Sequence, residues 1–114
     1  MNELGVLEER QHVLELLNAY ESLLTPKQRE MLSEYYRFDL SLSEIASSND
    51  ISRAAVHDAL DKAVKKLQSY EEKLRLVEKR KDIRITVDAI EAVEDESTKL
   101  ELYQQLVKDL TNGI

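Results

Sequence analysis

Apolar residues recur every three or four positions along most of the chain, which is the spacing of one face of an α-helix. The first such stripe predicts a helix over residues 3–22, and its members are Val13, Leu16, Leu17, Tyr20 and Leu24. A second helix is predicted from Pro26 to about Arg37. Thr25 is its expected N-cap, Pro26 suits the first helical position, and Gln28 completes a capping box.

Residues 40–60 predict a helix-turn-helix. Ser41 and Glu44 form a capping box at the first helix, and residues 47–50 interrupt the apolar pattern with side chains that tolerate a tight turn. Ser52 caps the second helix. The apolar residues expected between the two helices are Ile51, Val56 and Leu60. The residues expected on the outward face are Arg53, Ala54, His57, Asp58 and Asp61, as on a recognition helix held against its support.

The second helix of this motif has no stop signal until about Lys79. Its apolar residues alternate four and three positions apart, in the order Val56, Leu60, Ala63, Leu67, Tyr70, Leu74 and Val77. This is the 3.5-residue period of a coiled coil. A helix of about 28 residues would be roughly 42 Å long, longer than the small domain can cover. Its second half needs another surface, either the chain's own ends or a second copy, and we predict a homodimer.

After residue 82 the apolar pattern fits two structures. A short strand would consist of Ile83, Ile85 and Val87, although no partner strand is predicted. Helical spacing fits equally well, and we predict a short helix that includes Val87, Ile90 and Val93. A last helix is expected from about Glu96 to Leu110. The predicted fold class is all-α, with a helix-turn-helix domain over residues 1–68 and a helical extension over residues 69–114.

Composition supports an ordered chain of modest size. The 114 residues are 42% hydrophobic and 34% charged, with two Gly and one Pro. These proportions are typical of a helix-rich globular protein. The net charge is −7, and residues 25–69 hold seven basic and seven acidic side chains. Since duplex DNA is bound mainly through its phosphates, we expect this chain to bind generic DNA weakly.

No catalytic chemistry is predicted. Cys is absent, and the sequence has no Gly-rich phosphate loop, nucleophile elbow or His pattern for a metal. Ser52, His57 and Asp58 lie on one helix beside a turn, which cannot orient them as a triad. We therefore expect a protein that is not an enzyme and needs no cofactor or metal. No segment resembles a membrane span or signal peptide, so we also expect a soluble, cytoplasmic protein without membrane insertion.

A family resemblance extends these predictions. Residues 25–67, TPKQREMLSEYYRFDLSLSEIASSNDISRAAVHDALDKAVKKL, resemble the promoter-recognition helix-turn-helix of bacterial sigma factors, known as region 4. The chain is still more similar to the YlxM family, through LTPKQRE before the motif and SYEEKLRLVEK at residues 69–79. The resemblance implies a small bacterial helix-turn-helix protein, encoded beside signal recognition particle genes and regarded as a regulator. Asp50 stands where such turns usually carry Gly, although Asp tolerates the same conformation.

The leading hypothesis is a dimeric DNA-binding regulator. Arg53 and His57 would face base edges. The residues expected on phosphates are Lys27, Arg29, Ser52 and Lys62. For Lys27 and Arg29, a solvated charged face is an equal alternative. The rival hypothesis is a protein-interaction module for a component of the signal recognition particle, as the resemblance suggests, and a variant is binding to the RNA of that particle.

Overall fold

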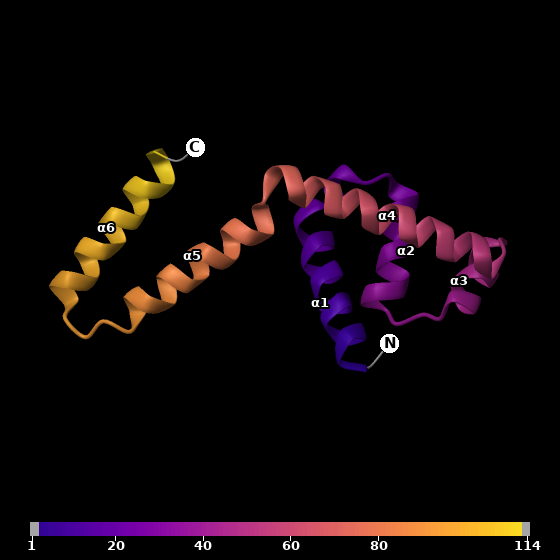
Figure 1. Ribbon diagram of the computed structural model, residues 1–114, viewed down its shortest axis with the longest axis horizontal. Coiled ribbons are helices and arrows are strands. Elements are labelled where there is room, and N and C mark those ends of the chain that lie inside the picture. The colour runs from indigo at the N-terminus through magenta and orange to yellow at the C-terminus, as the bar shows by residue number, and fades with distance from the viewer. Residues whose placement is uncertain (1–2, 113–114) are drawn as a thin grey trace. The chain divides into compact units, whose positions relative to one another are not determined.

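The computed structural model describes the backbone of residues 3–112 and the side chains of residues 9–112. Within that range the chain forms only helices and connecting turns, with no β-strand (Figure 1). The elements are α1 (Glu3–Tyr20), the 3-10 turn η1 (Glu21–Leu23), α2 (Pro26–Leu32), the π-helical turn η2 (Ser33–Arg37), α3 (Leu42–Asn49), α4 (Arg53–Leu74), α5 (Leu76–Glu91) and α6 (Glu96–Asn112). The predicted all-α fold is confirmed. No helix in the described part of the chain is both long and apolar enough to cross a membrane.

The chain divides into two compact units, Met1–Val77 and Glu78–Ile114. This division falls later than the one predicted after residue 68. The physical reason is that Tyr70 and Val77 pack against the core of the first unit, so the residues between them belong to that unit too.

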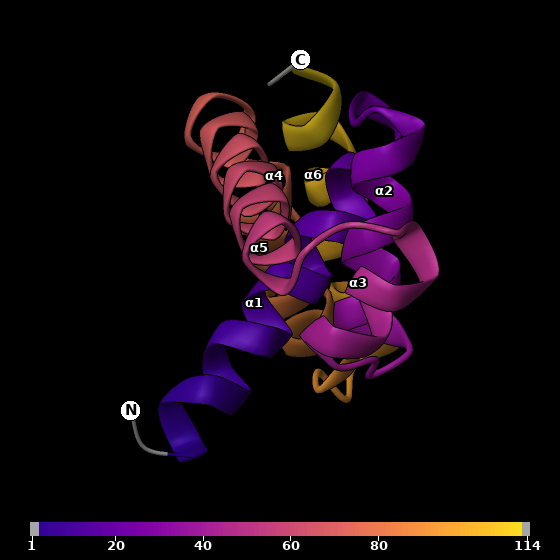
Figure 2. The same cartoon turned by 90° about the vertical axis from the view of Figure 1, so that its right-hand side faces the viewer.

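Helix α4 is the central element of the first unit. It packs against α1, α2 and α3, as two perpendicular views show (Figures 1 and 2). Its inward face carries Val56, Leu60, Ala63 and Leu67, each at most 6% exposed. The other helices supply the rest of this core, and its most buried members are Leu16, Leu17, Tyr20, Leu32 and Ile45. The predicted stripes of residues 13–24 and 56–67 are thus confirmed as core.

Ile51 departs from the predicted core, because it is 41% exposed. It stands in the turn itself, beyond the surfaces that α3 and α4 bury against each other. Its backbone N–H donates to the carbonyl of Ala46 at 3.1 Å, which closes the turn without using the side chain. Val56 and Leu60, at 0% and 6% exposure, fill the space that was predicted to need all three residues.

The predicted helix caps are present. The Thr25 and Ser41 hydroxyls accept hydrogen bonds from the backbone N–H groups of Gln28 and Glu44, at 3.2 and 3.0 Å. Both glutamine and glutamate side chains bond back to the cap residue, so each is a full capping box. Ser52 caps α4 in the same way, without the reciprocal bond. Because these bonds satisfy N–H groups that have no partner in the helix, the sequence alone places these three helix starts.

Three helical segments end in a left-handed residue, and none of the three is Gly. Asp39, Asp50 and Arg75 have φ angles of 57°, 54° and 54°. Asp50 therefore adopts the conformation for which the sigma-like turn usually has Gly. Asp pays less than most residues for this conformation, since its short side chain can bond locally. Arg75 has no such advantage and needs support from its surroundings.

The predicted unbroken helix through residue 79 is wrong, because α4 ends at Leu74 and α5 begins at Leu76. Tyr20 and Glu71 hold this break. The Tyr20 hydroxyl accepts from the N–H of Leu76 at 3.0 Å and donates to Glu71 Oε1 at 2.5 Å. The same oxygen of Glu71 accepts from the N–H of Val77 at 3.0 Å. Side chains thus satisfy the first N–H groups of α5, which a continuous helix would have paired with backbone carbonyls.

The break also removes the predicted coiled-coil seam over residues 67–77. Leu67 and Val77 are 0% and 7% exposed, because both pack on the first unit's own core. Leu74 is 45% exposed and lies outside that core. Of the two surfaces considered for this segment, the chain's own ends or a second copy, the first unit's own core covers Leu67 and Val77 and leaves Leu74 exposed.

The second unit is a helical hairpin of most of α5 and all of α6. The preference for helix over strand after residue 82 is confirmed. Asp95 caps α6, because its Oδ2 accepts from both the hydroxyl and the backbone N–H of Thr98, the latter at 3.0 Å. These two hydrogen bonds lower the pKa of the Asp95 carboxyl. The Tyr103 hydroxyl donates to the Glu91 carboxylate near the turn. Away from the turn the two helices diverge (Figure 1), and Ile90 is the one fully buried residue among those described in this unit.

The core register can be tested with two substitutions in adjacent turns of α4. Val56→Asp places a carboxylate where the side chain is 0% exposed, so we expect it to destabilise the fold by about 3 kcal/mol or more. Arg53→Ala changes an exposed side chain, and we expect a change within about 0.5 kcal/mol. Denaturant unfolding followed by circular dichroism measures both. Similar losses in the two variants would show that α4 is rotated relative to this description.

The junction between α4 and α5 can be tested with Tyr20→Phe. This substitution removes the hydroxyl's hydrogen bonds to the Leu76 N–H and the Glu71 carboxylate. We expect the free energy of unfolding to fall by about 1–3 kcal/mol. Phe retains the packing of the ring, so chemical denaturation reports the polar contribution.

The same variant gives a pH signature. Burial, assisted by the hydrogen bond to Glu71, raises the pKa of Tyr20 above the ordinary value of 10.0. Since the folded state binds the phenolic proton more tightly than the unfolded state, this contribution is complete below pH 10 and is lost as the pH rises through the folded-state pKa. We expect the stability difference between the unmodified chain and Tyr20→Phe to shrink above pH 10. A difference that is constant up to the alkaline limit of folding would contradict the assignment.

Candidate nucleic-acid interface

The outward face of α4 is as predicted from the sequence. Arg53, His57, Asp58, Asp61 and Lys62 are all exposed. Asp50 ends α3 and Ser52 begins α4, so the start of α4 projects from the turn of the motif. In this arrangement α3 and the core residues beneath it support a helix whose first two turns are accessible to a partner.

The six predicted site residues do not share one surface. Arg53 and His57 are four residues apart and lie on the same side of α4. Lys62 follows His57 by five residues, which at 3.6 residues per turn is roughly 140° around the helix axis. Asp58 and Asp61 occupy the angles in between. Arg53 and His57 on one side and Lys62 on the other therefore flank a strip of carboxylates, and Lys65 lies within this strip beside Asp61.

This acidic strip is partly compensated. Asp61 Oδ2 lies 2.9 Å from Lys65 Nζ, and Asp58 Oδ1 lies 3.9 Å from His57 Nδ1. The side chains of these two pairs are between 52% and 78% exposed. Such exposed pairs exchange readily with solvent and are worth little energy. A phosphate that approached the strip would therefore meet weakly held carboxylates.

A second group of cations comes from the far side of α4 and the start of α2, and we call it the lysine edge: Lys62 and Lys66 of α4, and Lys27 of α2. The start of α2 lies between the end of α3 and the middle of α4. Lys27 Nζ donates to Asn49 Oδ1, and Lys66 Nζ donates to Gln28 Oε1 at 3.3 Å. Lys62 lies one turn before Lys66 on the same side of α4.

The two other predicted site residues are Ser52, at the start of α4, and Arg29, in α2. Ser52 Oγ accepts the capping bond from the N–H of Ala55 at 3.0 Å. A hydroxyl that accepts one bond still has its hydrogen to donate, so capping and a phosphate contact are compatible. Arg29 is half-buried in α2 and lies on the same short helix as Lys27.

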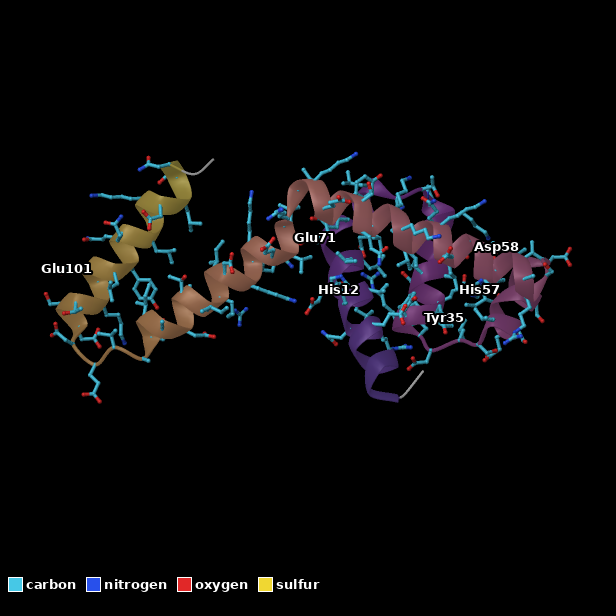
Figure 3. All side chains as sticks on the ribbon, viewed as in Figure 1. His12, Tyr35, His57, Asp58, Glu71 and Glu101 are labelled. Carbon is cyan, nitrogen blue, oxygen red and sulfur yellow. The ribbon has the colours of Figure 1, made fainter. Side chains whose placement is uncertain are left out.

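A cleft adjoins the Arg53–His57 side of α4, and we call it the tyrosine cleft. Its volume is about 320 Å³, and it lies between α1, η2, α3 and α4. Tyr35 and His57, labelled in Figure 3, are among its lining residues. The rings of Tyr35 and Tyr36 meet edge to face, with centroids 4.9 Å apart and planes at 83°. Both rings are partly buried and pack against the core.

Comparison with known proteins identifies the family. The family model UPF0122, described as "putative helix-turn-helix protein, YlxM / p13 like", matches residues 7–110. The chain belongs to the UPF0122 family. The predicted YlxM-type resemblance is therefore confirmed, and the match includes both compact units. UPF0122 is described by its helix-turn-helix and not by an enzymatic activity.

The matches between this chain and three UPF0122 relatives cover most of the length of each relative. A UPF0122 protein of Clostridium acetobutylicum is 36% identical over an aligned length of 113 residues, and the alignment covers 93% of this chain and 97% of the relative. One from Halalkalibacterium halodurans is 45% identical over 92 residues, 80% of this chain and 84% of the relative. One from Fusobacterium nucleatum is 43% identical over 79 residues, 69% of this chain and 77% of the relative.

For this UPF0122 protein, sequence reasoning missed the separation of the two cationic groups. The i, i+4 spacing of Lys62 and Lys66 was a signal that they share a side, and the predicted site omitted Lys66. The 140° between His57 and Lys62 also follows from spacing alone. The proximity of Lys27 to the end of α3 could not be read from spacing, because it depends on how α2 crosses α3 and α4.

Proposed function

We propose that this protein is a DNA-binding regulator that places the first turns of α4 in the major groove. The observation that carries the proposal is the helix-turn-helix itself, with a buried inner face of α4 and an accessible start that bears Arg53 and His57. Recognition helices of this type contact base edges through residues near their N-terminus. Arg offers a bidentate pair of donors to guanine, and His offers one donor or acceptor.

The phosphate contacts in this proposal come from the side of α4 that carries Lys62 and Lys66 and from the start of α2. Ser52 and the lysine edge would bind the backbone on one side, with Arg29 nearby on α2. Because Lys27 is also tied to Asn49, its ammonium group is already held close to the turn of the motif. Contacts of this kind set orientation and do not read sequence.

The acidic strip restricts the class of DNA that this surface accepts. Asp58 and Asp61 would repel any phosphate that approaches the middle of α4. The net charge of −7 gives the chain no general electrostatic attraction to the DNA backbone. A carboxylate can instead accept from the amino group of cytosine. We infer binding to a specific site, with weak affinity for generic duplex.

The second unit supports a homodimer, although through a different surface from the seam predicted over residues 67–77. A hairpin of this size does not enclose a core of its own. Its exposed apolar residues include Ile85, Leu100 and Val107, which are 68%, 59% and 62% exposed. Leu100 and Val107 are one heptad apart on α6, as in a coiled-coil seam. Pairing of two hairpins would bury them in a four-helix bundle.

A second candidate is a protein-interaction module, and the acidic strip on the recognition surface favours it. Fold alone does not decide between these functions. The YlxM resemblance directs attention to a component of the signal recognition particle, or to its RNA. Affinity capture from lysate with and without nuclease separates the cases, because only a protein partner survives digestion.

Neutralising the acidic strip tests whether α4 faces DNA. We expect Asp58→Asn with Asp61→Asn to strengthen binding of a generic duplex by about threefold to tenfold, since two opposing charges are removed from a phosphate-facing surface. Fluorescence anisotropy at low and moderate salt measures this. The matched control is Asp82→Asn with Asp88→Asn, which changes net charge equally in the second unit. Equal responses of the two double variants would place the DNA surface elsewhere.

Genomic footprinting of a tagged chain tests specific recognition. If Arg53 reads a base, Arg53→Ala should weaken binding at the recovered sites by about 1–3 kcal/mol and leave generic affinity nearly unchanged. If the unmodified chain recovers no sites, the protein-interaction candidate is favoured over DNA binding.

The quaternary proposal is tested by light scattering at micromolar concentration. We expect a dimer for the unmodified chain and a monomer for Val107→Glu, because the new carboxylate would be buried in the interface without a partner. Gln105→Glu adds the same charge on another side of α6 and should leave the dimer intact. A monomer for the unmodified chain would refute the proposal.

A further inference from the structure

The tyrosine cleft has an apolar and aromatic lining. Its walls include the rings of Tyr35 and Tyr36 and the side chains of Leu42, Leu60 and Val64. Its volume is about 320 Å³, which is more space than one amino-acid side chain occupies. The edge-to-face arrangement of the two rings presents a ring face and a ring edge from adjacent residues of η2.

Two carboxylates complete the cleft. Glu9 comes from α1 and Asp61 from α4. Glu9 forms no ion pair within the described part of the chain, and Lys65 engages Asp61 through Oδ2. Both acidic groups act on the same phenol. Burial is the main cause that raises the pKa of Tyr36, and the charges of Glu9 and Asp61 contribute to the rise.

The cation in the lining is already committed to other groups. The Arg10 guanidinium donates to the carbonyl of Tyr36 at 2.8 Å, to that of Tyr35 at 3.3 Å, and to the carboxylate of Asp39. These bonds tie α1 to the end of η2, where Asp39 adopts its left-handed conformation. Arg10 is paired with Asp39 and Asp61 with Lys65, which leaves the Glu9 carboxylate and the second oxygen of Asp61, Oδ1, as acceptors for a cationic ligand.

We propose that the tyrosine cleft binds an arginine side chain from a basic segment of a partner protein. The guanidinium plane would lie against the tyrosine rings and pair with Glu9 and Asp61, while its methylene stem would contact Leu42, Leu60 and Val64. Arginine suits such a site because its charge is delocalised over a plane that stacks on aromatic faces and bonds carboxylates. A phosphate group does not suit it, since both rim charges are negative.

This site differs in chemistry from the proposed DNA surface, and it does not depend on DNA binding. The two adjoin at His57, which lines the cleft and belongs to the outward face of α4. A protein segment seated in the cleft would therefore cover the Arg53–His57 side of the recognition helix. Binding of such a partner and of DNA would then be mutually exclusive.

The test titrates the full-length chain with N-acetylarginine amide, followed by two-dimensional amide NMR. We expect saturable shifts at Tyr35, Tyr36 and Asp61, with a dissociation constant in the millimolar range for a single side chain. N-acetylcitrulline amide has nearly the same shape without the charge, and it should bind at least about fivefold more weakly if the carboxylates select the guanidinium. Equal shifts with both compounds, or none in the cleft, would overturn the proposal.

Variants identify the groups responsible. Glu9→Gln with Asp61→Asn should weaken binding of the arginine compound by about tenfold, because both ion pairs are removed. The control is Asp82→Asn with Asp88→Asn, which changes net charge equally in the second unit and should leave affinity unchanged. Equal weakening by the control would reduce the effect to general electrostatics and refute the site. A DNA duplex that shifts the cleft resonances while the arginine compound does not would assign the cleft to nucleic acid instead.

Discussion

Helix α4 and the three helices beneath it depend on one contact surface, the apolar stripe from Val56 to Leu67. Each residue of that stripe is at most 6% exposed, and α1, α2 and α3 all pack on this helix. At 25 cal/mol or so for each square ångström of apolar surface removed from water, such burial dominates the stability of a small helical unit. The stripe also sets the rotation of α4 about its axis. That rotation places four polar residues on the exposed face of α4: Arg53, His57, Asp58 and Asp61.

A polar contact sets where α4 stops. The apolar pattern continues through residue 77 without interruption, and it would allow one long helix. The hydroxyl of Tyr20, a residue that is 1% exposed, instead bonds both Glu71 and the start of α5. A buried hydroxyl without partners would cost free energy, so the network and the break stabilise each other. The hydrogen bonds of this network hold Arg75 in a left-handed conformation, which is unfavourable for its residue type.

The charges on the recognition surface favour selectivity over strength. Arg53 and His57 lie on one flank of α4 and Lys62 and Lys66 on the other, while Asp58, Asp61 and Lys65 lie between them. A uniformly basic surface would bind any duplex, whereas in the proposed mode this one would favour partners that place positive or donor groups against Asp58 and Asp61. The tyrosine cleft continues the same logic on the Arg53–His57 side, with Glu9 as a further acidic group. UPF0122 proteins built in this way would combine a nucleic-acid fold with sites suited to basic protein segments.

Local interactions explain what the sequence by itself determined. The three capped helix starts, the core stripes of residues 13–24 and 56–67, and the outward position of Arg53 and His57 all depend on spacing within one helix or turn. Each was readable because the responsible atoms are at most a few residues apart. The left-handed Asp50 was readable for the same reason. The motif resemblance then led to the UPF0122 family over residues 7–110.

Only the tertiary structure decided the features that join distant residues. The break at Arg75 depends on Tyr20, and the lysine edge depends on the contact between Lys27 and Asn49. The tyrosine cleft brings Glu9 and Asp61 to one phenol although 52 positions separate them in the sequence. A periodic pattern records which face of a helix is apolar. It does not record which buried hydroxyl competes for a backbone N–H, or which side chains meet when helices cross, because these depend on packing over the whole unit.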